Sequence, residues 1–480
     1  MAVKRVLTGS LQSNGASPRL ASIVAKGVED LIVMRGWPVG ELLGSEQSLI
    51  EHYGVSRSVL REAVRLLEHK QVATMRRGPG GGLIVCAPDA TAIATTVANF
   101  FDFSAVGGED LHQARRSLEV LALRLAVERM SESGLRELRL SVATGRQDQS
   151  AVPENLHAPE NMHMALARLT RNSALSIFIQ ALSQAARAVE LEWKLGDGGA
   201  SAHSRIVTAL VAGELGLAER HLIEHLKHTA RRATEANPSR AAAITSNKLG
   251  ERIARRIAAD LHGSGHPVGS VIGSEATFLE RYEVSRSVFR ETVRILEYYD
   301  IVHMRRGPGG GVVIGARDPS SVVDAVTTYL DFMRIDPRHL REARRAVELS
   351  ALNLAIERLD ADGCERLRAE LEAEAAHEMG SVYKKAPDLH VLIGELSGNV
   401  ALHFFTLVLT RLQTSRIEAV QRTPSESAAI GHRIARAHDG VVEAMIAGDV
   451  GLARHRLERH LAAMTEFVAE KRVTAAPIGL

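Results

Sequence analysis

The spacing of apolar residues predicts the same order of elements in both halves of the chain. Near residues 45–70, apolar side chains recur every three or four positions, which predicts two short helices separated by a tight turn at Gly54. Ser45 and Ser56 stand where helix N-caps are expected. The segments 72–75 and 83–85 flank the sequence RRGPGGG, which predicts two short strands joined by a hairpin turn.

Beyond residue 88 the strand pattern ends, and apolar residues keep the spacing of amphipathic helices, as at Leu118, Leu121, Ala122 and Leu125. The predicted fold class is therefore mainly α. It consists of two tandem parts, and each part is a helix-turn-helix with a small β-hairpin wing followed by an all-α helical bundle.

An internal repeat accounts for this order. Residues 44–82 and 273–311 are identical at 24 of 39 positions without gaps, at an offset of 229. A weaker similarity continues downstream, where DLHQARRSLEVLALRLAVERM parallels HLREARRAVELSALNLAIERL. Each repeat spans about 230 residues, which is too long for a solenoid repeat. The chain is therefore predicted to be a duplicated two-domain protein, with the join in the stretch TEANPSRAAAITSNK.

The repeat and the change of pattern together define five segments. The expected bounds are 18–87 for winged helix-turn-helix 1, 88–236 for helical domain 1, 237–247 for a linker, 248–316 for winged helix-turn-helix 2 and 317–475 for helical domain 2.

Composition narrows the class of protein. Hydrophobic residues make up 45% of the 480 residues and charged residues 24%, so the chain is globular, and its net charge of +2 means that any basic surface is local. Cys86 and Cys364 match no metal-ligand spacing, so neither a disulfide framework nor a zinc finger is expected. No apolar run approaches the roughly 20 residues that span a bilayer. We therefore expect a cytoplasmic protein with no membrane partner.

The second helix of each helix-turn-helix carries arginines every four residues on one face. Arginine is the favoured reader of guanine in the major groove, and serine reaches phosphates or bases. A solvated arginine face is the alternative, but the turn, the caps and the wing occur together and occur twice. The candidate DNA-binding residues are Ser56, Arg57, Ser58, Arg61, Arg65, Arg76, Arg77 and Gly78 in the first repeat and Ser285, Arg286, Ser287, Arg290, Arg294, Arg305, Arg306 and Gly307 in the second.

The glycine-rich turn has an alternative role as a phosphate-binding loop. It lacks the GK[ST] ending of such loops, and it joins two predicted strands instead of leading into a helix. A hairpin wing that places its arginines near a DNA backbone therefore fits better.

These segments, GSE…YGVSRSVLREAVRLLE…MRRGPGGG, resemble the winged helix-turn-helix of the GntR superfamily of bacterial transcription regulators. The helical region that follows resembles the ligand-binding domain of the FadR branch, and the resemblance covers nearly the whole chain as two copies. The family commonly has an arginine after the SE pair, where this chain has Gln47 and Ala276, so part of the base readout is expected to differ. The resemblance implies operator contacts by Arg57, Arg61, Gly78, Arg286, Arg290 and Gly307.

Each helical domain carries three histidines at matching positions. The candidate metal ligands are His163, His203 and His225 in the first repeat and His390, His438 and His460 in the second. The last two histidines of each set are 22 residues apart, which places them on successive antiparallel helices facing one bundle core. Three converging imidazoles suit a divalent ion such as zinc or nickel, and a polar pocket without metal is the alternative.

In the FadR branch, such a triplet often holds a metal together with an aspartate one helical turn before the first histidine. That position is Pro159 in the first repeat and Ala386 in the second. Glu160 and Asp388 lie close by, and Glu160 stands three residues before its histidine, the better position for reaching an ion. We therefore expect the first site to hold metal better than the second.

The resemblance also places Arg115 and Arg344 where the family often has an arginine facing its pocket. A guanidinium there would bind an effector carboxylate in a bidentate manner. An intrahelical salt bridge, such as Arg115 with Glu119, is the alternative.

The expected function is that of a sequence-specific DNA-binding transcription regulator, a repressor and not an enzyme. Its helical domains would bind a small metabolite, an organic acid, to control binding to an inverted-repeat operator in double-stranded DNA. The alternatives are a regulator of the same family that responds to an acyl thioester, and a metal-dependent hydrolase that uses the three-histidine pocket.

The duplication predicts a covalent pseudo-dimer, and a homodimer of the whole chain would carry four DNA-binding heads. Residues 44–82 contain six Lys or Arg against four Asp or Glu, whereas residues 273–311 contain six against six. The first head is therefore expected to bind DNA more firmly.

Overall fold

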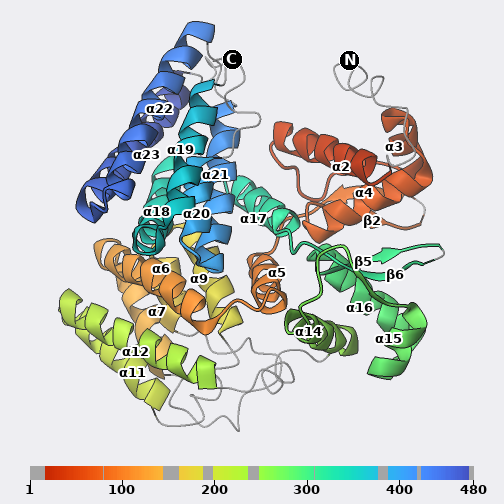
Figure 1. Cartoon of the computed structure of the whole chain (residues 1–480), viewed down its shortest axis with the longest axis horizontal. Coiled ribbons are helices and arrows are strands. Elements are labelled where there is room, and N and C mark those ends of the chain that lie inside the picture. The colour runs from red at the N-terminus through yellow and green to blue at the C-terminus, as the bar shows by residue number, and fades with distance from the viewer. Residues whose placement is uncertain are drawn as a thin grey trace. The chain divides into compact units, whose positions relative to one another are not determined.

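Figure 1 shows the computed structural model of the chain, in which helices predominate and short strands occur in two places. The structure describes residues 17–78, 80–143, 162–186, 198–235, 248–307, 309–376, 388–418 and 423–474. In these ranges no helix is long and apolar enough to cross a membrane. The chain divides into two compact units, residues 1–93 with 324–334 and residues 94–323 with 335–480. The expected linker, 237–247, lies outside the described residues, and the five predicted domain bounds stay a prediction.

Head 1, which forms most of the first unit, is the predicted helix-turn-helix with its wing. It consists of α2 (Ser17–Met34), β1 (Leu42–Gly44), α3 (Glu46–Tyr53), α4 (Arg57–His69), β2 (Ala73–Arg76) and β3 (Gly82–Val85). The predicted apolar stripe of α4 is confirmed, since Leu60, Ala63 and Leu67 are buried. They belong to one hydrophobic core with Val24 and Val28 of α2. This packing turns the opposite face of α4 towards solvent.

Two serines and one glycine set the turn between α3 and α4, as predicted. The Ser45 hydroxyl accepts a hydrogen bond from the Ser48 amide at 3.1 Å, and the Ser56 hydroxyl accepts one from the Val59 amide at 3.3 Å. Gly54 ends α3 in the left-handed region at φ 63°. The N-caps start both helices at the expected residues.

The wing is part of a three-stranded antiparallel sheet with the order β1-β3-β2. In the hairpin, Thr74 pairs with Ile84 and Arg76 with Gly82, so the two predicted strands are confirmed within one residue at each end. Strand β1 was not predicted, because its sequence LLG is too short to show a period of two.

Head 2, in the second unit, repeats these elements in the same order. It consists of α14 (Leu249–His262), β4 (Val271–Gly273), α15 (Glu275–Tyr282), α16 (Arg286–Tyr298), β5 (Val302–Arg305) and β6 (Gly311–Ile314). Its sheet has the matching order β4-β6-β5. Ser285 caps α16 through the Val288 amide at 3.4 Å, but the left-handed residue after α15 is Glu283, at φ 52°, instead of a glycine.

The second unit also holds both all-helical domains, which confirms the mainly α fold. Helical domain 1 comprises α6 (Gly108–Glu128), α7 (Glu132–Ala143), α8 (Met162–Leu169), α9 (Ser173–Ala185), α11 (Gly198–Val211) and α12 (Leu215–Glu235). Helical domain 2 comprises α18 (Pro337–Arg358), α19 (Ala361–Ala376), α20 (Leu389–Leu396), α21 (Val400–Glu418), α22 (Pro424–Ile446) and α23 (Val450–Thr474).

The two helical domains pack directly against each other, with α6 against α18 and α21. Aromatic side chains from both domains meet beside these helices. The rings of Phe178 and Phe405 stack with their centroids 4.2 Å apart, and Phe101, from the helix that precedes α6, meets Phe404 edge-on at 5.4 Å. The contact is therefore an apolar core shared by the two repeats.

The helix that follows each wing packs against the head of the other repeat. After head 1 comes α5 (Ala90–Phe103), which packs on head 2: Arg255 pairs with Asp102 at 2.6 Å, and the ring of Phe103 lies 4.9 Å from that of Tyr299. After head 2 comes α17 (Ser320–Phe332), whose Phe332 ring lies 5.1 Å from that of Trp37 in head 1. Each connecting helix thus contacts the head of the other repeat.

Candidate functional site

The outward face of α4 presents three arginines to solvent. The side chains of Arg57 and Arg61 are 64% exposed and that of Arg65 is 61% exposed. Oxygen Oε1 of Glu46, in the first turn of α3, lies 3.4 Å from Arg57 Nε and 3.1 Å from Arg61 Nε. One carboxylate therefore holds two of the three guanidinium groups close to the start of α3. The geometry suits an approach to nucleic acid, since arginine forks are the common donors to base edges and phosphates.

Head 2 has the corresponding face with looser ion pairing. Arg286, Arg290 and Arg294 lie exposed on α16. The carboxylate of Glu275 lies 3.9 Å from Arg286 Nε, farther than in the Glu46 pairs of head 1. The same face is therefore present in both heads, with less preorganised arginines in the second.

The wing turn needs its glycines for a steric reason. Gly78 and Gly80 adopt φ values of 98° and 71°, which favour glycine, and a Cβ on Gly81 would come within 2.3 Å of the Arg76 carbonyl oxygen. The Arg76 guanidinium donates to the Gly80 carbonyl at 3.0 Å, and Arg77 is exposed. Because the turn joins two strands, the prediction of a wing instead of a phosphate-binding loop is confirmed in its geometry.

The turn of head 2 is built in the same way. Arg305 donates to the Gly309 carbonyl at 2.9 Å, and Gly307 has φ 94°.

The three histidines of helical domain 1 converge from α8, α11 and α12. His163 Nε2 lies 3.1 Å from His225 Nε2, and His203 Nε2 lies 3.2 Å from the same atom. His163 and His225 are buried, and His203 is partly buried. The predicted convergence of three imidazoles is therefore what the structure has.

Helical domain 2 repeats the cluster on α20, α22 and α23. His390 Nε2 and His438 Nε2 lie 3.2 Å and 3.3 Å from His460 Nε2, and all three side chains are buried. In both domains the second and third histidines lie on successive helices, as their spacing predicts.

Two buried carboxylates, of Glu119 and Glu348, and the half-buried one of Glu374 lie against the outer nitrogen of three of these rings. Glu119 Oε2 lies 2.5 Å from His163 Nδ1, and Glu348 Oε2 lies 2.7 Å from His390 Nδ1. Glu374 lies 2.9 Å from His438 Nδ1. A carboxylate at Nδ1 favours the tautomer that carries its proton there, which leaves the Nε2 lone pair facing the cluster.

The charge state of the clusters follows from burial and from the charged groups beside them. Burial raises the pKa of Glu119, but Arg115 and His163 lower it by a larger amount. The resulting pKa is about 2, so this carboxyl is ionised. Burial and the neighbouring histidines hold the pKa of His225 and of His460 well below 6.5. Neutral imidazoles with free lone pairs are the form that binds metal.

The six histidines fit divalent metal ions. A zinc ion binds imidazole nitrogen at roughly 2.0–2.1 Å, so two ligands of a tetrahedral site stand about 3.3 Å apart. The closest Nε2 pairs in the two clusters are 3.1–3.3 Å apart. The Nε2 spacing of both clusters and the neutral rings of His225 and His460 thus suit such an ion. Burial lowers the pKa of His390, but the Glu348 carboxylate raises it by more, so an ion at the second cluster would displace a proton from this ring.

The structure bears on two expectations about these clusters and leaves a third untested. Arg115 makes the intrahelical salt bridge, with its Nε 2.7 Å from Glu119 Oε1, and Arg344 pairs with Glu348 in the same way. Asp388 does not face the cluster; its carboxylate caps α20 by accepting from the His390 amide at 2.9 Å. Pro159 and Glu160 lie outside the described residues, so the expectation that the first site holds metal better stays a prediction.

Sequence reasoning missed two roles. Glu119 was considered only as a salt-bridge partner and Glu348 was not named, although the repeated pattern ARRxxE places each of them one turn beyond an arginine. Glu374 was not identified at all, because it approaches His438 from 64 positions away and no local pattern marks it.

Comparison with known families agrees with this arrangement. The family profile of the FCD domain matches residues 110–228 and 339–463, together just over half of the chain, and each match contains one histidine triplet. The profile of bacterial regulatory proteins of the gntR family matches residues 20–82, in head 1.

Three curated relatives carry regulator names. The Uxu operon regulator of Haemophilus influenzae is 26% identical over 139 residues, 29% of this chain, and the match spans half the length of that relative. The Uxu operon transcriptional regulator of Escherichia coli is 25% identical over 248 residues, 47% of this chain and 91% of the relative. The putative L-lactate dehydrogenase operon regulatory protein of Escherichia coli is 25% identical over 226 residues, 45% of this chain and 85% of the relative.

Both kinds of site therefore coincide with the domains that the profiles match, the arginine face with the gntR match and the histidine clusters with the two FCD matches. The chain belongs to the FCD-domain members of the gntR family of bacterial regulatory proteins, and it is a DNA-binding transcription regulator whose helical domains bind a small metabolite.

Proposed function

We propose that the chain is a tandem regulator of the FadR branch, in which two fused repeats take the place of the two subunits of a dimer. The observation that carries this proposal is the direct packing of helical domain 1 on helical domain 2. In two relatives, 91% and 85% of the relative's own length aligns with less than half of this chain. One repeat therefore corresponds to nearly a whole relative, which supports a doubled architecture. One chain would then present two heads to one inverted repeat.

The DNA-contacting residues belong to this proposal. They are the arginine faces of α4 and α16 with Ser56, Ser58, Ser285 and Ser287 at their starts, and the wing residues Arg76, Arg77, Gly78, Arg305, Arg306 and Gly307. Arg57, Arg61 and Arg65 are accessible in head 1, which supports a role in the major groove. An operator would compete with Glu46 for two of these guanidinium groups.

Each helical domain would bind its effector beside the histidine triplet. A zinc or nickel ion held by the three Nε2 atoms would attract an organic acid through the carboxylate, and it would act as a Lewis acid centre. Buried Arg115 and Arg344, each already paired with a glutamate, would keep the charge of that glutamate balanced while the ligand binds. The name of the lactate-operon relative supports an organic acid.

Effector binding would change operator affinity because the ligand favours one placement of the heads over another. We expect repression in the absence of the effector. The curated relatives carry the names of regulators, which favours a regulator over the hydrolase alternative.

An electrophoretic shift with the DNA upstream of the chain's own gene tests the function. We expect a single shifted species that survives excess unrelated DNA and that disappears in the double variant Arg61→Ala/Arg290→Ala. Light scattering of the complex should give one chain per operator. A shift that unrelated DNA abolishes equally well would contradict specific binding, and two chains on one inverted repeat would contradict the pseudo-dimer.

A further inference from the structure

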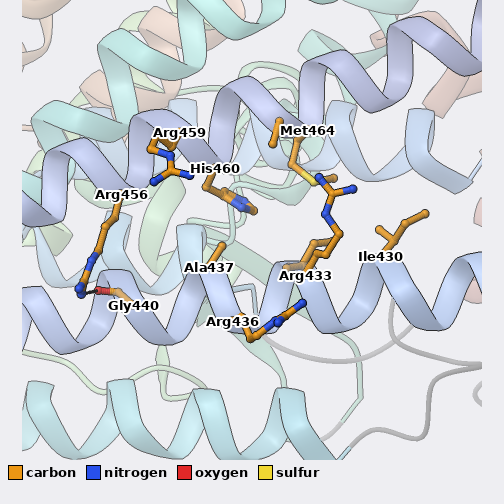
Figure 2. A pocket seen from close by; sticks show the side chains of 11 residues that line it. Ile430, Arg433, Arg436, Ala437, Gly440, Arg456, Arg459, His460 and Met464 are labelled. Atoms are coloured by element: carbon orange, nitrogen blue, oxygen red, sulfur yellow. Dashed lines mark hydrogen bonds between the residues drawn. The ribbon is translucent and has the colours of Figure 1, made fainter.

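Helical domain 2 contains a cavity of about 500 Å³ between α22 and α23. Figure 2 shows His460 at the cavity, with arginines from both helices around it. Arg433 and Arg436 come from α22, and Arg456 and Arg459 come from α23. No aspartate or glutamate is among the described residues that line the cavity, so its wall is strongly cationic.

Most of this positive charge is not balanced by neighbouring carboxylates. Arg456 pairs with Glu443 at 3.0 Å, and Arg436 donates to the backbone carbonyl of His432 at 3.4 Å. Within the described part of the chain, no carboxylate lies within 4.0 Å of the Arg433 or Arg459 guanidinium. Among the described residues, Arg456 is therefore the only one of the four arginines that pairs with a carboxylate, and the other three line the cavity beside the buried His460.

The first repeat keeps the histidines and lacks these arginines. Aligning His203 with His438 and His225 with His460 gives an offset of 235 for both helix pairs. At that offset the positions of Arg433, Arg436, Arg456 and Arg459 are occupied by Gly198, Ser201, His221 and Glu224. At these four positions helical domain 2 has four arginines where helical domain 1 has one glutamate and no arginine, whereas Gly440 of the lining corresponds to Arg205.

The chemistry of the lining selects for multiple negative charge. Guanidinium groups bind phosphate and carboxylate groups through paired N–H donors. Where several guanidinium groups converge, the single charge of a monocarboxylate is too small to balance them. Ile430, Ala437 and Met464 add an apolar part to the wall, which suits the carbon skeleton of a small organic anion.

We propose that helical domain 2 binds a small polyanion, a phosphate ester or a di- or tricarboxylate, between α22 and α23, and that helical domain 1 does not. The two repeats of one chain thereby recognise different ligand classes. The inference rests on the proposed function only for the regulatory consequence, because the binding itself needs no DNA.

Calorimetric titration of the full chain tests the site. The probes are inorganic pyrophosphate, tricarballylate and acetate at constant ionic strength, with the protein treated with EDTA so that no metal carries the binding. We expect one site per chain for pyrophosphate or tricarballylate. The probe that binds more tightly shows whether the site prefers phosphate or carboxylate groups. Acetate should bind at least about tenfold more weakly, since it engages fewer guanidinium groups.

The matched variants are Arg433→Gln/Arg459→Gln in the cavity and Arg368→Gln on α19, which is exposed and does not line it. We expect the first to weaken polyanion binding about tenfold or more and the second to leave it unchanged, with equal circular dichroism spectra. Arg459→Glu, which introduces the residue type of the first repeat, should weaken it further. Two equal sites per chain, or equal Kd values for acetate and pyrophosphate, would overturn the proposal.

The operator shift separates this proposal from the proposed function. If no polyanion binds while the chain still shifts its operator, the site is refuted and the regulator stands. If one pyrophosphate or tricarballylate binds per chain and the operator affinity stays constant, the site is supported and only its role as an effector site is refuted.

Discussion

Asn399 donates a hydrogen bond from its side-chain amide to the backbone carbonyl of Asp110, 289 positions earlier in the chain, at 3.1 Å. In the opposite direction, Asn172 donates to the carbonyl of His339 at 2.8 Å. Asp110 and His339 occupy equivalent positions of the two repeats. The two helical domains therefore contact each other through the same pair of surfaces used twice, as the subunits of a twofold dimer do.

The two asparagines differ in their second acceptor, which leads to a prediction. The Asn172 amide also donates to Glu342 at 3.0 Å, whereas the Asn399 amide donates to Gln113 at 2.9 Å. Asn172→Asp would set one carboxylate against another, but beside Asn399→Asp the Gln113 amide can turn and donate. We expect the free energy of unfolding to fall by about 2–3 kcal/mol for Asn172→Asp and by about 1 kcal/mol for Asn399→Asp.

Urea denaturation of the full chain, followed by circular dichroism, measures both losses. Aspartate keeps the side-chain oxygen that caps the helix, which in Asn399 accepts from the Leu402 amide at 2.9 Å. Loss of the helix cap therefore does not contribute to the measured difference in stability. Equal losses for the two variants would show that these amides do not hold the domains together.

The two heads should contribute unequally to operator affinity. Arg61→Ala is expected to cost about 1–3 kcal/mol of specific binding, since it removes one guanidinium from the α4 face, and Arg290→Ala is expected to cost less. The reason is that residues 44–82 carry an excess of basic over acidic residues, whereas residues 273–311 are balanced. Fluorescence anisotropy with labelled operator measures both, and Arg139→Ala, on the exposed face of α7, is the control. An Arg290→Ala loss as large as that of Arg61→Ala would contradict the prediction.

Elements that depend on a local pattern could be read from the sequence. The caps at Ser45 and Ser56 and the wing strands were found within a residue, because N-cap chemistry and a period of two act over a few positions. The histidine clusters were found because the repeat shows the same spacing twice.

Elements that depend on long-range packing could not be read in this way. Nothing in the sequence of α5 marks it for head 2, since the contact between Asp102 and Arg255 joins residues 153 positions apart. The same holds for Glu374, which reaches His438 only after the bundle has formed. Local propensity determines where a helix forms, and burial in the tertiary structure determines which other elements that helix packs against.

Glu374 should strengthen metal binding in helical domain 2 without being a ligand. Its two carboxylate oxygens lie 2.9 Å and 3.0 Å from His438 Nδ1, where they orient the ring and raise the basicity of Nε2. We expect Glu374→Gln to weaken binding of zinc at one of two sites per chain by about tenfold, in line with the usual effect of such partners.

Competition with a chromophoric chelator measures the zinc affinity of each site. Glu372→Gln, two residues earlier and exposed, is the matched control and should change neither site. Equal weakening of both sites, or none in Glu374→Gln, would show that this carboxylate does not act through His438.

The buried pair of Arg115 and Glu119 should be essential to helical domain 1 through its charge balance. Their side chains are 3% and 2% exposed, with Arg115 Nε 2.7 Å from Glu119 Oε1. Arg115→Met leaves a buried carboxylate without its main counter-charge, and we expect a loss of about 3–5 kcal/mol in the free energy of unfolding. Arg116→Met, on the exposed side of the same helix, should cost no more than about 0.5 kcal/mol.

The double variant Arg115→Met/Glu119→Gln distinguishes charge balance from packing. It removes both charges, and the glutamine oxygen can still accept from His163 Nδ1, so we expect it to recover most of the stability lost in Arg115→Met. Urea denaturation of the wild type and these variants measures the effect. If the double variant is as unstable as Arg115→Met, the loss comes from the missing guanidinium contacts and the charge argument is wrong. If Arg115→Met itself loses less than about 1 kcal/mol, then solvent or the neighbouring His163 balances the charge of Glu119, and the arginine is not its main counter-charge.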